Sequence, residues 1–113
     1  MDFDTAYQFV LQQTLAPSDD PRETFITCLR QGRPPVPGQV TSLLLALKVL
    51  GEALRDEPAL DRPLLRALLV LIDDSGSLYR QGITTGVLWP PLLADDLNRL
   101  RQAARSILTG PMA

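Results

Sequence analysis

The chain has 113 residues, the length of a single domain, and its 45% hydrophobic content is enough for a packed core and too high for a disordered chain. Eleven basic side chains against thirteen acidic ones give a net charge of −2, which excludes the strong positive field typical of nucleic-acid binding proteins. The absence of histidine and the presence of one cysteine, Cys28, exclude a serine triad, a zinc or iron–sulfur centre and an intrachain disulfide.

Prolines and glycines divide the sequence into blocks of helical periodicity, and no block alternates with the period of a strand. The first helix is predicted from about Asp4 to Leu15, with Asp2 or Asp4 as its N-cap. The residues of its apolar stripe are Phe3, Tyr7, Val10, Leu11 and Leu15. Phe9 falls off this stripe, beside two glutamines, and is therefore a candidate for a surface contact.

The second helix has the most explicit start signal in the chain. In the segment DPRE, Asp20, Pro21 and Glu23 match the N-cap, N1 and N3 positions of a capping box. The helix is predicted to run to about Arg30, and Gly32 is expected to take the left-handed conformation just beyond its end. The residues expected to face inward are Phe25, Ile26 and Leu29.

The segment RPPVPG, residues 33–38, is a proline-rich connector that favours extended backbone. A third helix is predicted from about Pro37 to Arg55 or Asp56. Because its apolar face is broad and its polar face narrow, this helix is the expected centre of the core.

Asp61 is predicted to cap a fourth helix, from about Arg62 to Gln81. Its weak point is the segment DDSG, residues 73–76, because aspartate, serine and glycine are poor residues in mid-helix. The apolar periodicity resumes in step after this segment, so we favour one helix, bent there, over a break.

A second proline-containing connector, residues 82–91, leads to the last helix. This helix is predicted to start near Pro90 or Pro91 and to stop at Gly110-Pro111. The expected fold is all-α: a compact bundle of four to five helices with Pro-rich connectors, forming one domain over residues 1–113.

The tripeptide Arg-Gln-Gly occurs twice, at residues 30–32 and 80–82, and each copy is followed by a double proline. Helix C-termini favour basic residues and favour glycine just beyond them, so we interpret both copies as helix stops. A repeated ligand site, or a duplicated unit of helix, connector and helix, is the alternative interpretation.

Both connectors contain candidate partner-binding residues. Trp89, Pro90 and Pro91 form either an apolar docking surface or a plug, in which Leu88 and Trp89 fold under the last helix; we favour the plug. Arg33, Pro34 and Pro35 lie in a segment suited to a partner's aromatic groove, although a fixed strap between helices is the interpretation we favour.

Three apolar residues, Phe9, Leu45 and Val70, are expected near the polar faces of their helices. A contiguous patch of such residues would mark an interface. No glycine-rich phosphate loop is present, since no segment matches GxxxxGK[ST]. We therefore expect a non-enzymatic helical module that uses no cofactor and binds a protein partner or a second copy of itself as a homodimer.

The alternative function is a small-molecule binding protein or enzyme that uses the interior of the bundle as a pocket. Arg30, Arg33 and Arg80 would then hold an anionic ligand through their guanidinium groups. The two most apolar windows are too short to span a bilayer and each carries a charge, and the N-terminal residues are acidic. With one cysteine and no transmembrane segment, the protein is expected to be cytoplasmic.

The segments PVPGQVTS, residues 35–42, and WPPLL, residues 89–93, resemble small uncharacterised helical proteins of cyanobacteria. The resemblance covers most of the chain and implies a cyanobacterial origin and a pattern of five helices, with no mechanism attached. Some such proteins carry a dethiobiotin-synthetase label. We reject that label here, because this chain lacks the phosphate loop and the length of that ATP-dependent enzyme family.

Overall fold

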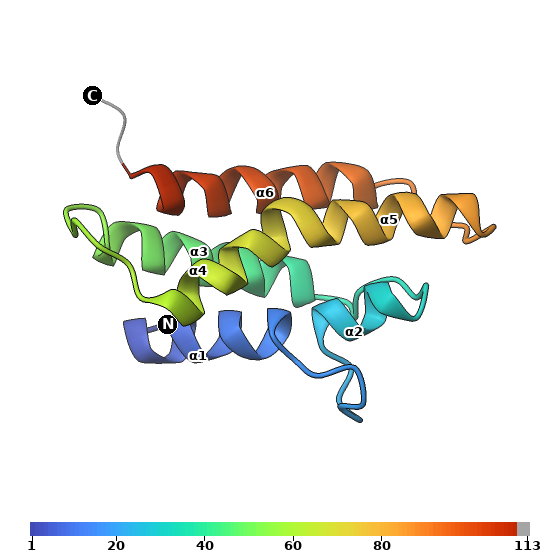
Figure 1. Ribbon diagram of the computed structural model, residues 1–113, viewed down its shortest axis with the longest axis horizontal. Coiled ribbons are helices and arrows are strands. Elements are labelled where there is room, and N and C mark those ends of the chain that lie inside the picture. The colour runs from blue at the N-terminus through green and yellow to red at the C-terminus, as the bar shows by residue number, and fades with distance from the viewer. Residues whose placement is uncertain (111–113) are drawn as a thin grey trace.

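Helices account for all the regular secondary structure of residues 1–110, the part of the chain that this computed structural model describes. The elements are α1 (Phe3–Thr14), α2 (Phe25–Arg30), α3 (Gln39–Ala53), α4 (Arg62–Leu69), the π-helical η1 (Val70–Asp74), α5 (Ser75–Thr84) and α6 (Leu93–Thr109). Because α4, η1 and α5 follow one another without a gap, these elements form a bundle of five helices within the described residues (Figure 1). The all-α prediction is confirmed.

The long helix α3 lies between α1 and α6 and packs against both (Figure 1). Its residues Leu43, Ala46, Leu47 and Leu50 are completely or almost completely buried. The combined helix α4–η1–α5 crosses this layer and contacts α1 near its start and α6 further along. The predicted position of α3 at the centre of the core is therefore confirmed, and its leucines Leu43, Leu47 and Leu50 belong to the core cluster.

Two of the predicted helix starts are confirmed by their capping hydrogen bonds. The Asp2 carboxylate accepts from the Thr5 amide at 2.8 Å, and the Asp61 carboxylate accepts from the Leu64 amide at 3.2 Å. In each case an aspartate in extended backbone satisfies an amide that has no partner inside the helix.

The predicted start of α2 is wrong. The helix begins at Phe25, and Thr24 caps it by accepting a 3.3 Å hydrogen bond from the Thr27 amide. The Asp20 carboxylate instead binds both the amide and the guanidinium of Arg22, which lowers the pKa of Asp20 to about 2. Asp20 and Thr24 are both suitable N-caps. Thr24 caps the helix because it directly precedes Phe25, which is fully buried.

The face that α1 presents to the core also differs from the predicted stripe. Its buried residues are Ala6, Val10, Gln13 and Thr14, whereas Phe3 and Leu15 are exposed. Phe9 is half-buried and packs against the core, so the prediction that it is an outlying surface residue is wrong. The helix is rotated about its axis relative to the prediction, so that the polar side chain of Gln13 faces the interior.

The fourth helix is continuous, as predicted, and its irregularity, η1, begins three residues before the weak segment 73–76 and ends within it. The π-helical turn η1 ends at Asp74, and the hydroxyl of Ser75 donates a 3.0 Å hydrogen bond to the carbonyl of Leu71. Serine hydroxyls that bind the carbonyl four residues back compete with the helical ladder and bend it. The helix then continues to Thr84, three residues beyond the predicted end at Gln81.

The last helix begins at Leu93, two residues after the predicted proline pair ends. Pro91 and Leu92 form the turn that precedes it. Gly110 follows its final residue with a φ of 71°, which agrees with the predicted glycine stop. Pro111, the second residue of that predicted stop, lies outside the described residues.

Replacing the two competing caps tests the corrected start of α2. We expect Thr24→Ala to lower the free energy of unfolding by about 1–2 kcal/mol, since it removes the N-cap hydroxyl. Thr24→Ser keeps the hydroxyl and should lose less than Thr24→Ala. Asp20→Ala should also lose less, because its partners, the amide and the guanidinium of Arg22, belong to an exposed residue and can bind water instead. Urea denaturation of the three variants measures the difference, and a larger loss for Asp20→Ala would restore the predicted capping box.

Candidate functional site

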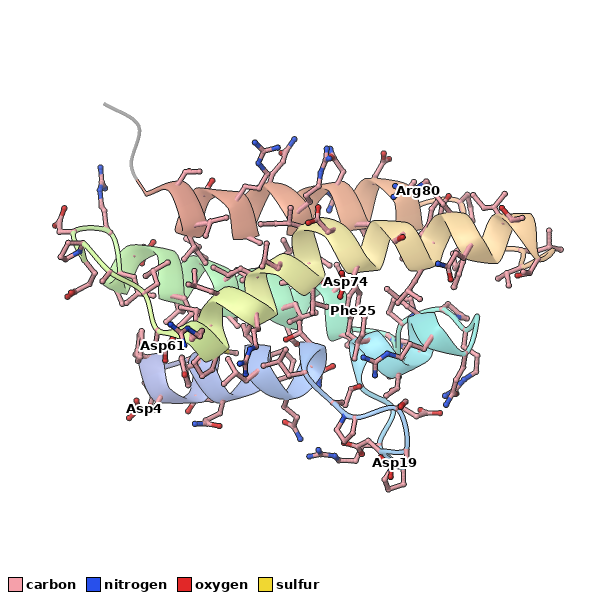
Figure 2. The ribbon with its side chains drawn as sticks, viewed as in Figure 1. Asp4, Asp19, Phe25, Asp61, Asp74 and Arg80 are labelled. Atoms are coloured by element: carbon pink, nitrogen blue, oxygen red, sulfur yellow. The ribbon has the colours of Figure 1, made fainter. Side chains whose placement is uncertain are left out.

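The first connector, residues 31–38, is held in place by two buried side-chain amides. Gln13 Oε1 accepts from the Phe25 amide at 2.8 Å and from Gln39 Nε2 at 2.9 Å. Gln39 Nε2 also donates to the Glu23 carbonyl at 2.9 Å, and Gln39 Oε1 accepts from the Val36 amide at 3.1 Å. Figure 2 shows Phe25 where α2 begins. This Gln13–Gln39 pair therefore ties α1, α2, the first connector and α3 together.

Gly32 ends α2 as predicted, with a left-handed φ of 69°. The amide of Arg33 donates to the Cys28 carbonyl at 2.9 Å, and the amide of Gly32 donates to the Leu29 carbonyl at 3.1 Å. These two hydrogen bonds form a Schellman motif, which satisfies carbonyls that the helix leaves without partners. The first Arg-Gln-Gly copy is therefore a helix stop.

The second Arg-Gln-Gly copy is not a helix stop, so this prediction is wrong. Gly82 lies inside α5 and is buried, and the helix instead ends with Gly86, whose φ is 91°. The amide of Val87 then donates to the Gly82 carbonyl at 2.8 Å. Local preferences fit both Gly82 and Gly86 as a stop, and Gly82 stays inside the helix, where the Trp89 ring packs against it.

Both glycines of the repeated tripeptide receive side chains of the second connector, residues 85–92. A Cβ atom on Gly82 would lie 2.5 Å from Trp89 Cζ2, closer than atoms can approach. A Cβ atom on Gly32 would lie 3.0 Å from Val87 Cγ2. Gly82 on α5 therefore leaves room for Trp89, and Gly32 at the end of α2 leaves room for Val87. We call the position of Trp89 against Gly82 its seat.

Trp89 is fixed at this seat by a hydrogen bond and by stacking. Its Nε1 donates to the Tyr79 carbonyl at 3.0 Å, and its ring stacks on the Tyr79 ring with 5.8 Å between centroids. The half-buried Trp89 packs against the core, which agrees with the predicted plug, but its seat is α5 rather than the start of α6. Leu88 does not join the plug: it is 96% exposed.

The two connectors meet in an apolar groove of about 240 Å³ at the starts of α3 and α6. We call it the connector groove; it is lined by Pro34, Pro35, Val36, Pro37, Gly38, Val40, Thr41, Pro90, Leu92, Leu93 and Asp96. Leu92 is 66% exposed, and Leu88 lies on the same short connector. The structure therefore brings together three of the predicted residues, Pro34, Pro35 and Pro90.

The two most exposed large apolar side chains of the described residues, Leu88 and Leu92, are not among the predicted partner-binding residues. Leu88 is predicted to join the plug, and Leu92 enters only as part of the segment WPPLL. Both leucines flank the segment Trp-Pro-Pro, and a connector has no helical periodicity from which burial could be predicted.

The other predicted residues do not gather at the groove. Arg33 pairs with Glu23 at 2.7 Å, and Pro91 is exposed but does not line the groove. Leu45 is 49% exposed on α3, one turn beyond the groove residue Thr41. Val70 is half-buried on η1. Phe9, Leu45 and Val70 thus lie on three different elements, α1, α3 and η1.

The three arginines of the anion hypothesis are also dispersed. Arg30 Nη1 donates to the Ala16 carbonyl at 2.7 Å, and the Arg33 guanidinium binds Glu23 and Gln31. Arg80 lines a cleft between α5 and α6, and Arg30 lines a separate one between α2 and α5, so the three guanidinium groups share no site. The bundle interior at α3 is filled by leucines. Arg30 instead stabilises the loop between α1 and α2, and Arg33 ties Gln31 of the first connector to Glu23 of that loop.

Comparison with protein-family models, curated proteins and solved structures finds no match for this chain. Among residues 1–110, no group of three or more His, Cys, Asp or Glu side chains is placed to hold a metal ion. Over the same residues, no helix combines the length and the apolarity required to cross a membrane.

The Gln13–Gln39 pair can be tested with a matched neighbour. We expect Gln13→Leu to lower the free energy of unfolding by about 2 kcal/mol or more, because the buried Phe25 amide loses its acceptor. Gln12→Leu, an exposed change one residue earlier, should alter it by about 0.5 kcal/mol or less. Chemical denaturation compares the two variants, and equal stabilities would contradict the role of the pair.

The seat of Trp89 can be tested at two helical glycines. An alanine at Gly51 would place its Cβ 3.6 Å from Ile107 Cγ1, an ordinary contact, so Gly51→Ala should raise helix stability by up to about 1 kcal/mol. Gly82→Ala should destabilise the protein despite the same gain, because the Trp89 ring must move. It should also shift the fluorescence of this single tryptophan to longer wavelength. An unchanged spectrum in Gly82→Ala would contradict the seat.

Proposed function

We propose that this protein is a non-enzymatic helical interaction module, and that the connector groove with Leu88 and Leu92 is its partner-binding surface. The observation that supports this most directly is the exposure of two leucines on a connector that is otherwise fixed. Leu88 is 96% and Leu92 is 66% exposed, although the adjacent Trp89 is seated on α5. Large apolar side chains exposed beside an apolar groove are typical of interaction sites.

The chemistry of the groove supports docking rather than catalysis. Asp96 is the only ionisable side chain among its lining residues, and it lies 3.6 Å from Arg99 in an ion pair. This carboxylate is paired with a guanidinium and has no second acidic, basic or nucleophilic side chain beside it in the lining to share a catalytic step. Apolar contact with a partner is therefore the interaction that this lining favours.

The partner we propose is a second copy of the chain. In a twofold dimer each copy presents the same surface, so the leucines of one copy would fill the groove of the other. This surface carries almost no charge, and the net charge of the whole chain is only −2, so electrostatic repulsion between copies is small. The prolines of both connectors restrict the backbone before association, which reduces the entropy lost on binding.

The setting proposed for this module is the cytoplasm. Its single cysteine, Cys28, is buried, and burial raises the pKa of its thiol, which suits a structural thiol in a reducing compartment. The two segments that resemble small helical proteins of cyanobacteria, residues 35–42 and 89–93, contribute to the groove. A cyanobacterial origin, with a role at this surface, is part of the proposal.

Sedimentation equilibrium of the full chain over a wide concentration range tests the proposal. We expect a monomer–dimer equilibrium, and we expect Leu88→Glu and Leu92→Glu each to weaken it at least about tenfold in Kd. Leu69→Glu, at a leucine of α4 that is 47% exposed and lies outside the groove, is the control and should leave the Kd unchanged. A wild-type monomer at every concentration would overturn self-association, as would equal effects of all three variants.

A further inference from the structure

A polar cleft between the fourth helix and α6 lies outside the connector groove. It has a volume of about 350 Å³, and its walls are η1, α5 and α6. The polar side chains that line it include Asp73, Tyr79, Arg80, Asn98 and Arg101. We call it the arginine cleft. Its volume falls in the range of small-molecule sites in proteins, about 300–1,000 Å³.

The two arginines come from different helices, and both are free to bind a ligand. Within residues 1–110, neither Arg80 nor Arg101 lies within 4 Å of a carboxylate, whereas Arg22, Arg33 and Arg99 are all in ion pairs. The cleft contains one carboxylate, that of Asp73. Two guanidinium groups and one carboxylate give it a local charge of +1, on a chain whose net charge is −2.

Each guanidinium is held toward the cleft by a specific local feature. Arg101 Nη2 donates to Asn98 Oδ1 at 3.0 Å, which orients the group and leaves its other N–H donors available. Arg80 lies over Gly76: a Cβ atom at that position would be 3.3 Å from Arg80 Nη1. Glycine in mid-helix is unfavourable, and here its missing side chain lets the arginine fold along α5.

The π-helical turn η1 lies directly before α5, the helix that carries Arg80. One extra residue in a helix turns everything after it by about 100°, so η1 contributes to the register in which Arg80 lines the cleft. Such turns are costly to a helix and occur frequently at functional sites.

We infer that the arginine cleft binds a phosphate group, either as the free ion or as part of a small phosphorylated molecule. Guanidinium groups pair with phosphate oxygens through two parallel N–H donors, and two of them converge here from α5 and α6. The Asn98 side chain holds one of them in position. This inference is independent of the connector groove and would stand if the protein proved to be a monomer.

Isothermal titration calorimetry and thermal unfolding test this site, with inorganic phosphate and glycerol 3-phosphate as the two probes. Sodium chloride at equal ionic strength is the reference, because screening alone affects all arginines alike. For the wild type we expect saturable binding and a rise in Tm of about 6 °C at a probe concentration near ten times Kd. Tighter binding of glycerol 3-phosphate would identify a phosphorylated molecule, and equal affinities would identify the free ion.

Arg80→Gln and Arg101→Gln should each weaken binding at least about tenfold. Arg66→Gln, a change of the same charge on α4 outside the cleft, should bind like the wild type. Circular dichroism checks that all the variants fold. No saturable binding of either probe to the wild type would overturn the inference, and so would an equal loss in all the arginine variants, because charge screening rather than a site would then be the cause.

Discussion

The path of the chain between α1 and α3 depends on one buried contact, the hydrogen bond between Gln13 and Gln39. The same two amides satisfy the Phe25 amide, the Glu23 carbonyl and the Val36 amide. Removing Gln13 would leave the buried Phe25 amide without its acceptor, and removing Gln39 would leave two partly buried main-chain groups without partners. Such a loss costs more free energy than the hydrogen bonds themselves contribute. The pair therefore joins the first connector and the start of α2 to α1 and α3.

The second connector is held by close packing together with hydrogen bonds. Val87 and Trp89 occupy space that side chains at positions 32 and 82 would otherwise fill, and the Val87 amide and Trp89 Nε1 donate to the Gly82 and Tyr79 carbonyls. Because both connectors are fixed in this way, the groove between them is a defined part of the fold. Its exposed leucines are therefore presented on a rigid frame, which is what an interaction surface requires. Tyr79 links this frame to the arginine cleft, since it stacks on Trp89 and also lines the cleft.

Local signals predicted most of the fold, and they failed where two equivalent signals lay close together. The Asp61 cap, the Gly32 stop and the buried leucines of α3 depend on residues a few positions apart, so spacing was sufficient. At α2, Asp20 and Thr24 are both good N-caps, and the burial of Phe25 selects the second. At the end of α5, two glycines fit a helix stop, and the tryptophan ring selects between them.

The sequence by itself determined the class of the fold, the existence of the helices and the richness of both connectors in proline, because these depend on periodicity and on backbone restrictions. Only the tertiary structure decided the surfaces. Whether Leu88 is buried or exposed, which arginines face a common cleft and which connector residues meet all depend on contacts between segments far apart in the chain. Such contacts are fixed by packing in three dimensions, and residue spacing along one helix carries no record of them.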